Sequence, residues 1–150
     1  MSVELTPNGT RGVKMPSVPR PLAKIMLRAV TWFMRLRGVH LLELTTVGSK
    51  SGKSHGVTLA YFPAGDQSWL VVASSSGAAK HPAWYFNMAC NPDKVWITLD
   101  GHKIPVKLES LKGAEREAAW KQIVTEAPNY GEYQVKTDRE IPVVRLTAIR

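Results

Sequence analysis

The chain has 150 residues, of which 44% are hydrophobic and 21% charged, and these values exclude two independent domains, a disordered chain and a fibrous one. Its formal net charge is +8, yet no acidic residue occurs between Glu4 and Glu43, a stretch that holds seven basic residues. Because the remainder is close to neutral, the charge argues against a surface devoted to nucleic acid.

The first 18 residues mix Pro, Gly, Ser and Thr with polar side chains and show no sustained period, which predicts a flexible arm that carries little of the fold. We expect residues 19–150 to form a single domain. It begins with a helix at about residues 19–37, where apolar residues recur at helical spacing after a proline in the first turn. Opposite the apolar stripe lie Arg20, Lys24, Arg28 and Arg35.

This basic amphipathic helix is too short and too charged to span a bilayer. We favour the interpretation that its apolar face packs on the rest of the domain, because most amphipathic helices in soluble domains cover a core. The alternative is peripheral contact with an anionic membrane, with Trp32 beside the apolar stripe and able to touch lipid.

Strands dominate the rest of the chain. Residues 39–46, 55–62 and 68–73 are predicted as strands, joined by a glycine-bounded loop at 48–52 and a turn at 63–66. A loop of small residues at 74–80 then precedes a helix that ends near Cys90, before Asn91-Pro92.

Residues 94–99 and 102–108 form a predicted hairpin with its turn at Asp100-Gly101, and Pro105 indicates an edge strand or a bulge in the second strand. A helix over 114–126, with Ala119, Trp120, Ile123 and Val124 inward, and a strand over 142–148 follow. Strands joined mostly as hairpins favour an antiparallel sheet over a parallel doubly wound one. We therefore predict a mainly β, α+β fold with an antiparallel, Greek-key-like barrel and flanking helices.

The single cysteine, Cys90, cannot form an intramolecular disulfide, and the N-terminus lacks the apolar core of a secretory signal. We expect a cytoplasmic protein, membrane-associated if the helix binds lipid, and Cys90 as a buried structural thiol. The four histidines lack metal-ligand spacing, so no metal site is expected.

Two loops carry candidate chemistry. Gly48–Ser54 has three residues between its glycines and precedes a strand, so it fails as a nucleotide-binding P-loop. Its backbone N–H groups, lysines and hydroxyls nevertheless suit an anion. The loop Ser74–Lys80 precedes a helix, and its small side chains allow a flat ligand to approach the backbone. Tyr130 and Tyr133 stand one helical turn apart and could clamp a ring or donate a proton.

Five separated segments together resemble the deazaflavin-dependent nitroreductase family of actinobacteria. They are Thr45–Gly52 (TTVGSKSG), Val72–Asn87 (VASSSGAAKHPAWYFN), Asn91-Pro92, Tyr130–Tyr133 (YGEY) and Thr137–Val143 (TDREIPV). The match runs in order from the N-terminal helix to the C-terminus.

The resemblance implies a split β-barrel of the flavin- and deazaflavin-binding type. It also implies an enzyme that transfers a hydride from reduced coenzyme F420 to a quinone, a nitroaromatic or an α,β-unsaturated lactone or ester. By family position, the cofactor's phosphate and acidic tail would contact the first loop and the strand after it, at Ser49, Lys50, Ser51, Gly52, Val57 and Thr58. The deazaflavin ring would be lined by Ala73, Ser74, Ser75, Trp84, Tyr85, Asn87 and Tyr130. Ser74, Tyr130 and Tyr133 would be the catalytic residues, and Tyr61 and Tyr133 would face the substrate.

The chain departs from the family pattern at three positions: the family often has Arg at Ser49, Lys at Ser75 and Tyr at Ala127. With fewer cations near the tail, cofactor affinity would depend more on Lys50, Lys53 and His55. Two alternatives remain, an FMN-dependent oxidoreductase on the same barrel and a non-catalytic carrier of F420 or a lipophilic ligand. The expected partner is a small-molecule substrate, with no nucleic acid and no obligate protein partner.

Overall fold

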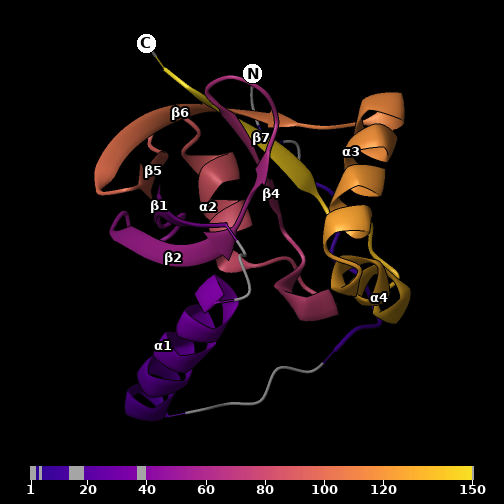
Figure 1. Ribbon diagram of the computed structural model, residues 1–150, viewed down its shortest axis with the longest axis horizontal. Helices are drawn as coiled ribbons and strands as arrows, with labels where there is room; N and C mark the ends of the chain where they lie inside the picture. Colours follow the sequence, from indigo (N-terminus) through magenta and orange to yellow (C-terminus); the bar gives the residue numbers. More distant parts are fainter. Residues whose placement is uncertain (1–2, 4, 14–18, 37–39, 150) are drawn as a thin grey trace.

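The computed structural model describes residues 3, 5–13, 19–36 and 40–149. A seven-stranded sheet is flanked by helices (Figure 1). The helices are α1 (Arg20–Leu36), the 3-10 turn η1 (Ser75–Gly77), α2 (Ala83–Cys90), α3 (Gly113–Glu126) and α4 (Asn129–Lys136). The strands are β1 (Leu41–Val47), β2 (Ser54–Ala60), β3 (Phe62–Pro63), β4 (Ser68–Val72), β5 (Trp96–Leu99), β6 (His102–Ser110) and β7 (Val143–Ala148).

The strand order in the sheet is β2-β1-β5-β6-β7-β4-β3, and every neighbouring pair is antiparallel. In Figure 1 the sheet curls around α2, while α3 and α4 lie together on its other side. The prediction of a mainly β, antiparallel barrel with flanking helices is confirmed. The predicted hairpin is confirmed too, because Asp100 and Gly101 both have positive φ, 50° and 80°, as the tightest hairpin turns require.

Pro105 does not mark an edge strand, because β6 is an interior strand, and it does not mark a bulge, because the register with β5 runs to Pro105 without an inserted residue. Residues 102–105 of β6 pair with β5, and residues 106–110 pair with β7. Pro105 stands where the strand passes from one neighbour to the other, a position at which its missing N–H interrupts neither ladder.

Both faces of the sheet are buried around β4 and β7. On β4, Val71 belongs to a cluster that includes Tyr85 and Met88 of α2, whereas Leu70 and Val72 point to a second cluster that includes Ile123 of α3. Alternation along a strand produces this division, because successive side chains point to opposite faces. The sheet therefore holds α2 on one face and the α3–α4 pair on the other.

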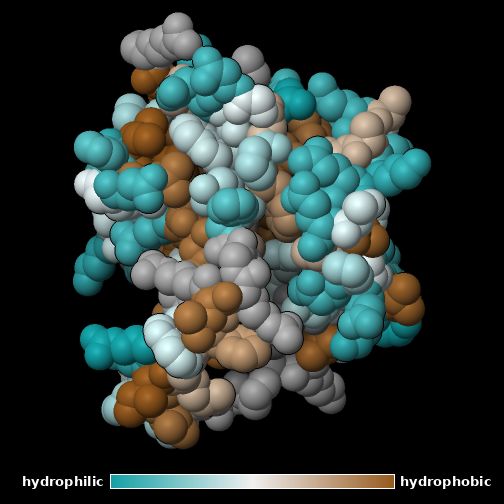
Figure 2. Space-filling model, viewed as in Figure 1, coloured by the Kyte–Doolittle hydropathy of each residue, from teal (hydrophilic) through white to brown (hydrophobic). Residues whose placement is uncertain are grey.

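The described apolar side chains of α1 are about half to two-thirds exposed, so they do not form the buried face that our favoured interpretation expected. Ile25, Trp32 and Leu36 are about two-thirds exposed, at 65%, 65% and 66%. Figure 1 shows α1 projecting from the body, and Figure 2 shows hydrophobic side chains on this lower projection. Amphipathic periodicity identified the helix correctly but carries no information about what covers its apolar side. Among the described helices, none combines the length and the apolar composition that a membrane span requires.

The described part of the N-terminal segment contacts the domain, so the expectation that it carries little of the fold is corrected for residues 3 and 5–13. Val3 is buried in the α2 cluster. The Gly9 N–H donates to the Ala79 carbonyl at 2.7 Å, and the Val13 N–H donates to the Gly77 carbonyl at 3.0 Å. A domain boundary at residue 19 stays a prediction. Cys90, expected to be buried, is exposed at the end of α2.

Candidate functional site

The connection between β1 and β2 is a compact turn. The Gly48 N–H donates to the Lys53 carbonyl at 2.8 Å, and the Gly52 N–H donates to the Gly48 carbonyl at 3.1 Å. Gly52 has φ +69°, which L-residues with a side chain rarely adopt, and a Cβ on Gly48 would clash with the Ser51 hydroxyl. The turn therefore favours glycine at position 52 by its backbone conformation, whereas a side chain at position 48 would require the Ser51 hydroxyl to move. Lys50 and Ser51 are exposed at the tip of the turn.

Helix α2 holds this turn through a buried amide. The Ser49 N–H donates to Oδ1 of Asn87 at 3.1 Å, and Nδ2 of Asn87 donates to the Thr46 hydroxyl at 3.3 Å. One helical turn later, Nδ2 of Asn91 donates to the Val47 carbonyl at 3.2 Å. Asn87 in α2 and Asn91 directly after it therefore fix the end of β1 and the start of the turn together.

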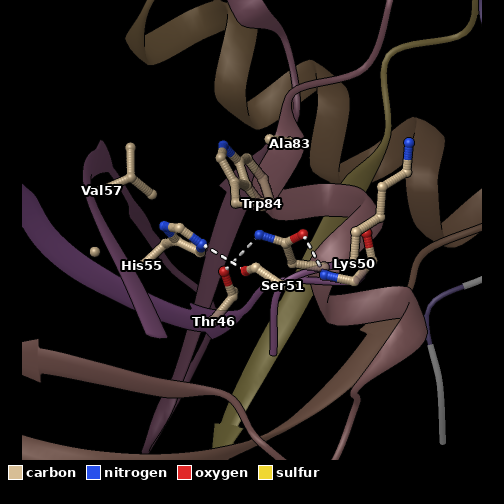
Figure 3. Close-up of a pocket in the computed structure, with 11 residues that line it drawn as sticks. Thr46, Lys50, Ser51, His55, Val57, Ala83 and Trp84 are labelled. Atoms are coloured by element: carbon tan, nitrogen blue, oxygen red, sulfur yellow. Dashed lines mark hydrogen bonds between the residues drawn. The ribbon is translucent and has the colours of Figure 1, made fainter. Parts of the chain in front are cut away.

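A cavity of 510 Å³ opens between this turn and α2. Figure 3 shows His55 and Val57 on one side of it, Trp84 and Ala83 from α2, Thr46 and Ser51 below, and Lys50 away from His55. Its lining residues are Thr46, Gly48, Ser49, Lys50, Ser51, His55, Gly56, Val57, Ala83, Trp84 and Asn87. None of them is acidic. The cavity thus combines a lysine, hydroxyls and an imidazole with an apolar indole wall, a combination suited to an anionic group attached to a flat ring.

Several predicted residues meet in this cavity: Ser49, Lys50, Ser51, His55, Val57, Trp84 and Asn87. Gly52 and Lys53 belong to the same turn without lining the cavity. Thr58 does not meet them, because it follows Val57 on the strand and lies on another cavity with Glu43. Tyr85 is fully buried in the α2 cluster, and Tyr61 packs beside His40 with ring centroids 5.5 Å apart.

The second predicted loop lies between β4 and α2. Ala73 is fully buried and Ser74 is nearly so, while Ser75 has φ +44° and Gly77 has φ +83°. A Cβ on Gly77 would meet the Tyr133 carbonyl oxygen at 2.9 Å, so the loop lies directly against α4. Ser75 is not glycine, and a left-handed conformation of such a residue costs about 1–2 kcal/mol. Surrounding contacts must stabilise it.

The two predicted catalytic tyrosines lie on α4 and contact each other. The Tyr130 and Tyr133 rings are 5.6 Å apart at 82°, and Tyr130 also meets the Phe62 ring at 5.7 Å. Burial, followed by the neighbouring Tyr133, raises the pKa of Tyr130 to about 12. Tyr130 is therefore protonated at neutral pH, when it is a hydrogen-bond donor and a poor acid. Neither tyrosine lines the cavity beside the β1–β2 turn.

Sequence reasoning did not assign Thr46, Gly48, Gly56 or Ala83 to the site. Strand alternation was an available signal against Thr58, because His55 and Val57 share one face of β2 and Thr58 points to the other. Ala83 stands one residue before Trp84 at the start of α2. Its place in the cavity depends on how the helix sits against the turn, which the sequence pattern does not specify.

Residues 23–148 match the sequence profile of a family described as F420H(2)-dependent quinone reductase. The chain is 38% identical over 110 residues to an F420H(2)-dependent quinone reductase of Mycobacterium tuberculosis (strain ATCC 25618 / H37Rv), covering 71% of this chain and 72% of that protein. A solved F420-H2 dependent reductase (FDR-A) is 41% identical with a TM-score of 0.62, over 71% of this chain and 92% of that one. A second solved structure, described as a domain-swapped dimer, is 36% identical with a TM-score of 0.63, over 84% and 98%.

Proposed function

Because the chain belongs to the F420H(2)-dependent quinone reductase family, it is an oxidoreductase with F420 as hydride donor, and we propose that the cavity beside the β1–β2 turn holds this cofactor. The sequence resemblance, the enzyme class, the cofactor and a quinone acceptor are confirmed at the level of the family. The family favours F420 over FMN, and a reductase over a non-catalytic carrier. Nitroaromatic and α,β-unsaturated acceptors stay predictions.

The observation that carries the proposal is the chemistry of the cavity wall. Lys50, Ser51 and His55 contribute hydrogen-bond donors to the cavity wall, and no acidic side chain lines the cavity. This donor set fits the phosphate and carboxylates of the F420 tail. Trp84 supplies an apolar surface for the adjoining part of the cofactor. The Ser49 N–H is engaged by Asn87, so Ser49 would contribute its hydroxyl and not its backbone.

Reduced F420 supplies the hydride when it is bound. For the chain's own residues, we assign Ser74 and Ser75 to the ring, and Tyr130 and Tyr133 to the acceptor. With its raised pKa, the Tyr130 phenol donates a hydrogen bond that polarises a carbonyl oxygen of the acceptor and keeps its own proton. Water then supplies the proton that completes the reduced product.

The binding experiment is titration with oxidised and reduced F420, following fluorescence. We expect the wild-type protein to bind, and Lys50→Gln to weaken binding roughly fivefold, the size of one exposed charge contact. Lys121→Gln removes a lysine from the distant helix α3 and should bind like the wild type. Absence of association in either redox state would refute the proposed function.

Turnover tests the assigned roles separately. Anaerobic incubation with reduced F420 and a panel of quinones, nitroaromatics and enones is followed by the return of oxidised-cofactor absorbance. We expect Ser74→Ala and Tyr130→Phe each to lower kcat about tenfold or more, the low end of a single general-acid or hydrogen-bond contribution. Unchanged turnover in both variants would remove the assigned roles while leaving cofactor binding intact.

We also propose that α1 makes peripheral contact with anionic membrane. Its apolar residues are exposed, and Lys24 and Arg28 on the same helix are exposed as well. With no acidic residue between Glu4 and Glu43, the segment complements a negatively charged surface. Such contact would bring the reductase to lipid-soluble quinones.

Liposome sedimentation tests this contact. We expect binding to phosphatidylserine-containing vesicles at low salt, weaker binding to neutral vesicles, and loss of binding in Ile25→Gln. The matched control is Val135→Gln, which removes an exposed valine (74%) from α4. No sedimentation with anionic vesicles would refute the proposal. A wild-type dimer in solution that Ile25→Gln dissociates would identify a second copy of the chain as the occupant instead.

A further inference from the structure

Arg139 is a buried arginine whose guanidinium binds one loop at three points. Only 3% of the residue is exposed. Its Nε donates to the Ala78 carbonyl at 2.8 Å, Nη1 to the Ala73 carbonyl at 3.0 Å, and Nη2 to the Ser74 carbonyl at 2.7 Å. These three acceptors lie at the two ends of the Ser74–Gly77 loop. A single planar group thereby fixes the distance between the loop's entry and its exit.

The charge of Arg139 is stabilised by backbone carbonyls and not by a carboxylate. The carboxylates next to it in sequence bind other groups in the described structure. Glu140 pairs with Nε of Arg116 at 2.9 Å, and Asp138 accepts from Thr10 and Arg11. A buried cation without a carboxylate is costly unless all its donors are used. Replacement of Arg139 by an apolar residue would remove the side-chain donor from three carbonyls at one place, although the Ser74 carbonyl would keep the Gly77 N–H as a partner.

His81 completes the site around the guanidinium. Nδ1 of His81 lies 3.0 Å from Nη1 of Arg139, and Nε2 lies 2.9 Å from the Thr6 carbonyl. An arginine only donates, so Nδ1 is the acceptor and Nε2 carries the proton. Burial, aided by the charge of Arg139, lowers the pKa of His81, against the opposing effect of the Thr6 hydrogen bond. A neutral His81 thus ties Arg139 to the N-terminal segment.

Peptide geometry determines where the loop's own donors point. In a trans peptide the N–H is opposite the carbonyl of the preceding residue. Since the Ala73 and Ser74 carbonyls point to Arg139, the N–H groups of Ser74 and Ser75 point away from it, to the opposite side of the loop. The positive φ of Ser75, 44°, lies within the segment that Arg139 spans. Arg139 therefore holds both the direction of these donors and the unfavourable backbone conformation.

We propose that Arg139 is a positioning residue for the cofactor, holding the Ser74–Gly77 loop so that the Ser74 and Ser75 N–H groups face the bound ring. This inference rests on the proposed F420 site. Arg139 acts from the far side of the loop and does not contact the cofactor. Its effect reaches the ring through the two peptide groups that it orients.

The test compares Arg139→Lys with Arg116→Lys. Lysine keeps the charge but cannot reach three carbonyls with one planar group. Arg116 also donates to a backbone carbonyl, that of Ile141, at 2.7 Å, but does not contact the loop. We expect Arg139→Lys to raise the Kd and the KM for F420 at least about tenfold, with a change below about twofold in the KM for the quinone. Arg116→Lys should leave the Kd and the KM for F420 unchanged, although it should lower the free energy of unfolding by a similar amount to Arg139→Lys.

Each outcome separates this inference from the proposed function. Failure of the wild-type protein to bind F420 refutes the site itself. Wild-type binding together with wild-type constants in Arg139→Lys refutes only the role of Arg139. If Arg139→Lys does not fold, NMR of the wild-type protein decides: added F420 should shift the Arg139 Nε–H resonance together with the Ser74 and Ser75 amides. An Nε–H resonance that does not move overturns the inference.

Discussion

Asn87 shapes the cavity through the backbone that it holds. Its carbonyl oxygen accepts from the Ser49 N–H and its amide nitrogen donates to the Thr46 hydroxyl, so both ends of the side chain are engaged. The sequence resemblance placed Asn87 near the ring, and the residue does line the cavity. What the resemblance did not indicate is that Asn87 joins α2 to the β1–β2 turn. Its importance for cofactor binding is therefore predicted to be indirect.

Asn87→Ala should lower the free energy of unfolding by about 1–3 kcal/mol, because it leaves the partly buried Ser49 N–H and the buried Thr46 hydroxyl without their partner. The released turn should also raise the Kd for F420. Asn91→Ala is the matched control, since it removes one hydrogen bond to Val47 from the residue directly after the same helix without touching Ser49. Urea unfolding and F420 titration measure the two effects. Equal F420 affinities in the two variants would contradict the role given to Asn87.

Tyr130 should make the protein sensitive to alkaline pH. Its pKa in the folded protein is raised to about 12 from 10.0, so the folded state holds the phenol proton more tightly than the unfolded state. The contribution of Tyr130 to the free energy of unfolding is therefore fully present below about pH 10. It falls as the pH rises toward about 12, by up to ~1.4 kcal/mol per pH unit. Tyr130→Phe should remove this dependence.

The measurement is urea unfolding at about pH 9 and about pH 11 for the wild type and the variant. Tyr61→Phe, which removes a phenol outside α4, is the control and should retain the wild-type slope. Identical slopes in Tyr130→Phe and the wild type would show that Tyr130 is not the group responsible.

At the level of elements, the structure of the strongly periodic segments could be predicted from the sequence, whereas the contacts of the segments without a period could not. The helix at 20–36, the hairpin at Asp100-Gly101 and most strands of the sheet follow from local spacing and turn residues, and the structure confirms them. The strand predicted over 55–62 is instead divided into β2 and β3, and α4 was not predicted as a helix. The N-terminal residues 5–13 have no such period, because their contacts are made by the backbone and by polar side chains. Those contacts join Thr10 and Arg11 to Asp138, more than 120 residues away in sequence.

Asp138 is predicted to hold this N-terminal segment against the Ser74–Lys80 loop. Its carboxylate accepts from the Thr10 N–H at 2.8 Å and the Arg11 N–H at 2.9 Å. The Thr10 hydroxyl, followed by the Arg11 N–H, lowers the pKa of Asp138 to about 2. The stabilisation by this contact is thus fully present above pH 3.8, the pKa of the carboxyl in the unfolded chain. It is lost as the pH falls toward about 2.

Asp138→Ala should accelerate amide hydrogen exchange at Gly9 and Val13, whose N–H groups bond to the Ala79 and Gly77 carbonyls. Asp93→Ala, at an exposed aspartate beyond α2, is the control and should leave both rates unchanged. If Asp138→Ala exchanges at the wild-type rate, the segment is held by other contacts.

For the whole molecule, one sheet serves two hydrophobic clusters. β4 and β7 each contribute side chains to both, Val71 and Val144 to the α2 cluster and Leu70 and Val143 to the α3 cluster. Because the clusters share these strands, neither can be lost without disturbing the other. The protein is therefore expected to unfold in one transition.

Ile123→Ala tests this coupling from the α3 side. Ile123 is fully buried, so the substitution should lower the free energy of unfolding by about 2–5 kcal/mol. Tryptophan fluorescence and far-UV circular dichroism should still report the same urea midpoint. Val135→Ala, at a residue that is 74% exposed, should change the free energy by less than about 0.5 kcal/mol. Two separate midpoints in Ile123→Ala would show that the clusters unfold independently.

The sequence by itself determined most element types, the antiparallel fold class, the family and most residues that line the cavity beside the β1–β2 turn. These depend on periodicity, on turn residues such as Asp100-Gly101 and on ordered motifs, all of which are local in the chain. Only the tertiary structure decided that Tyr85 is core, that Thr58 faces away from the cavity, that the apolar face of α1 is exposed and that Arg139 holds the Ser74–Gly77 loop. Each of these depends on which distant residues come together in space, and local spacing does not encode such contacts.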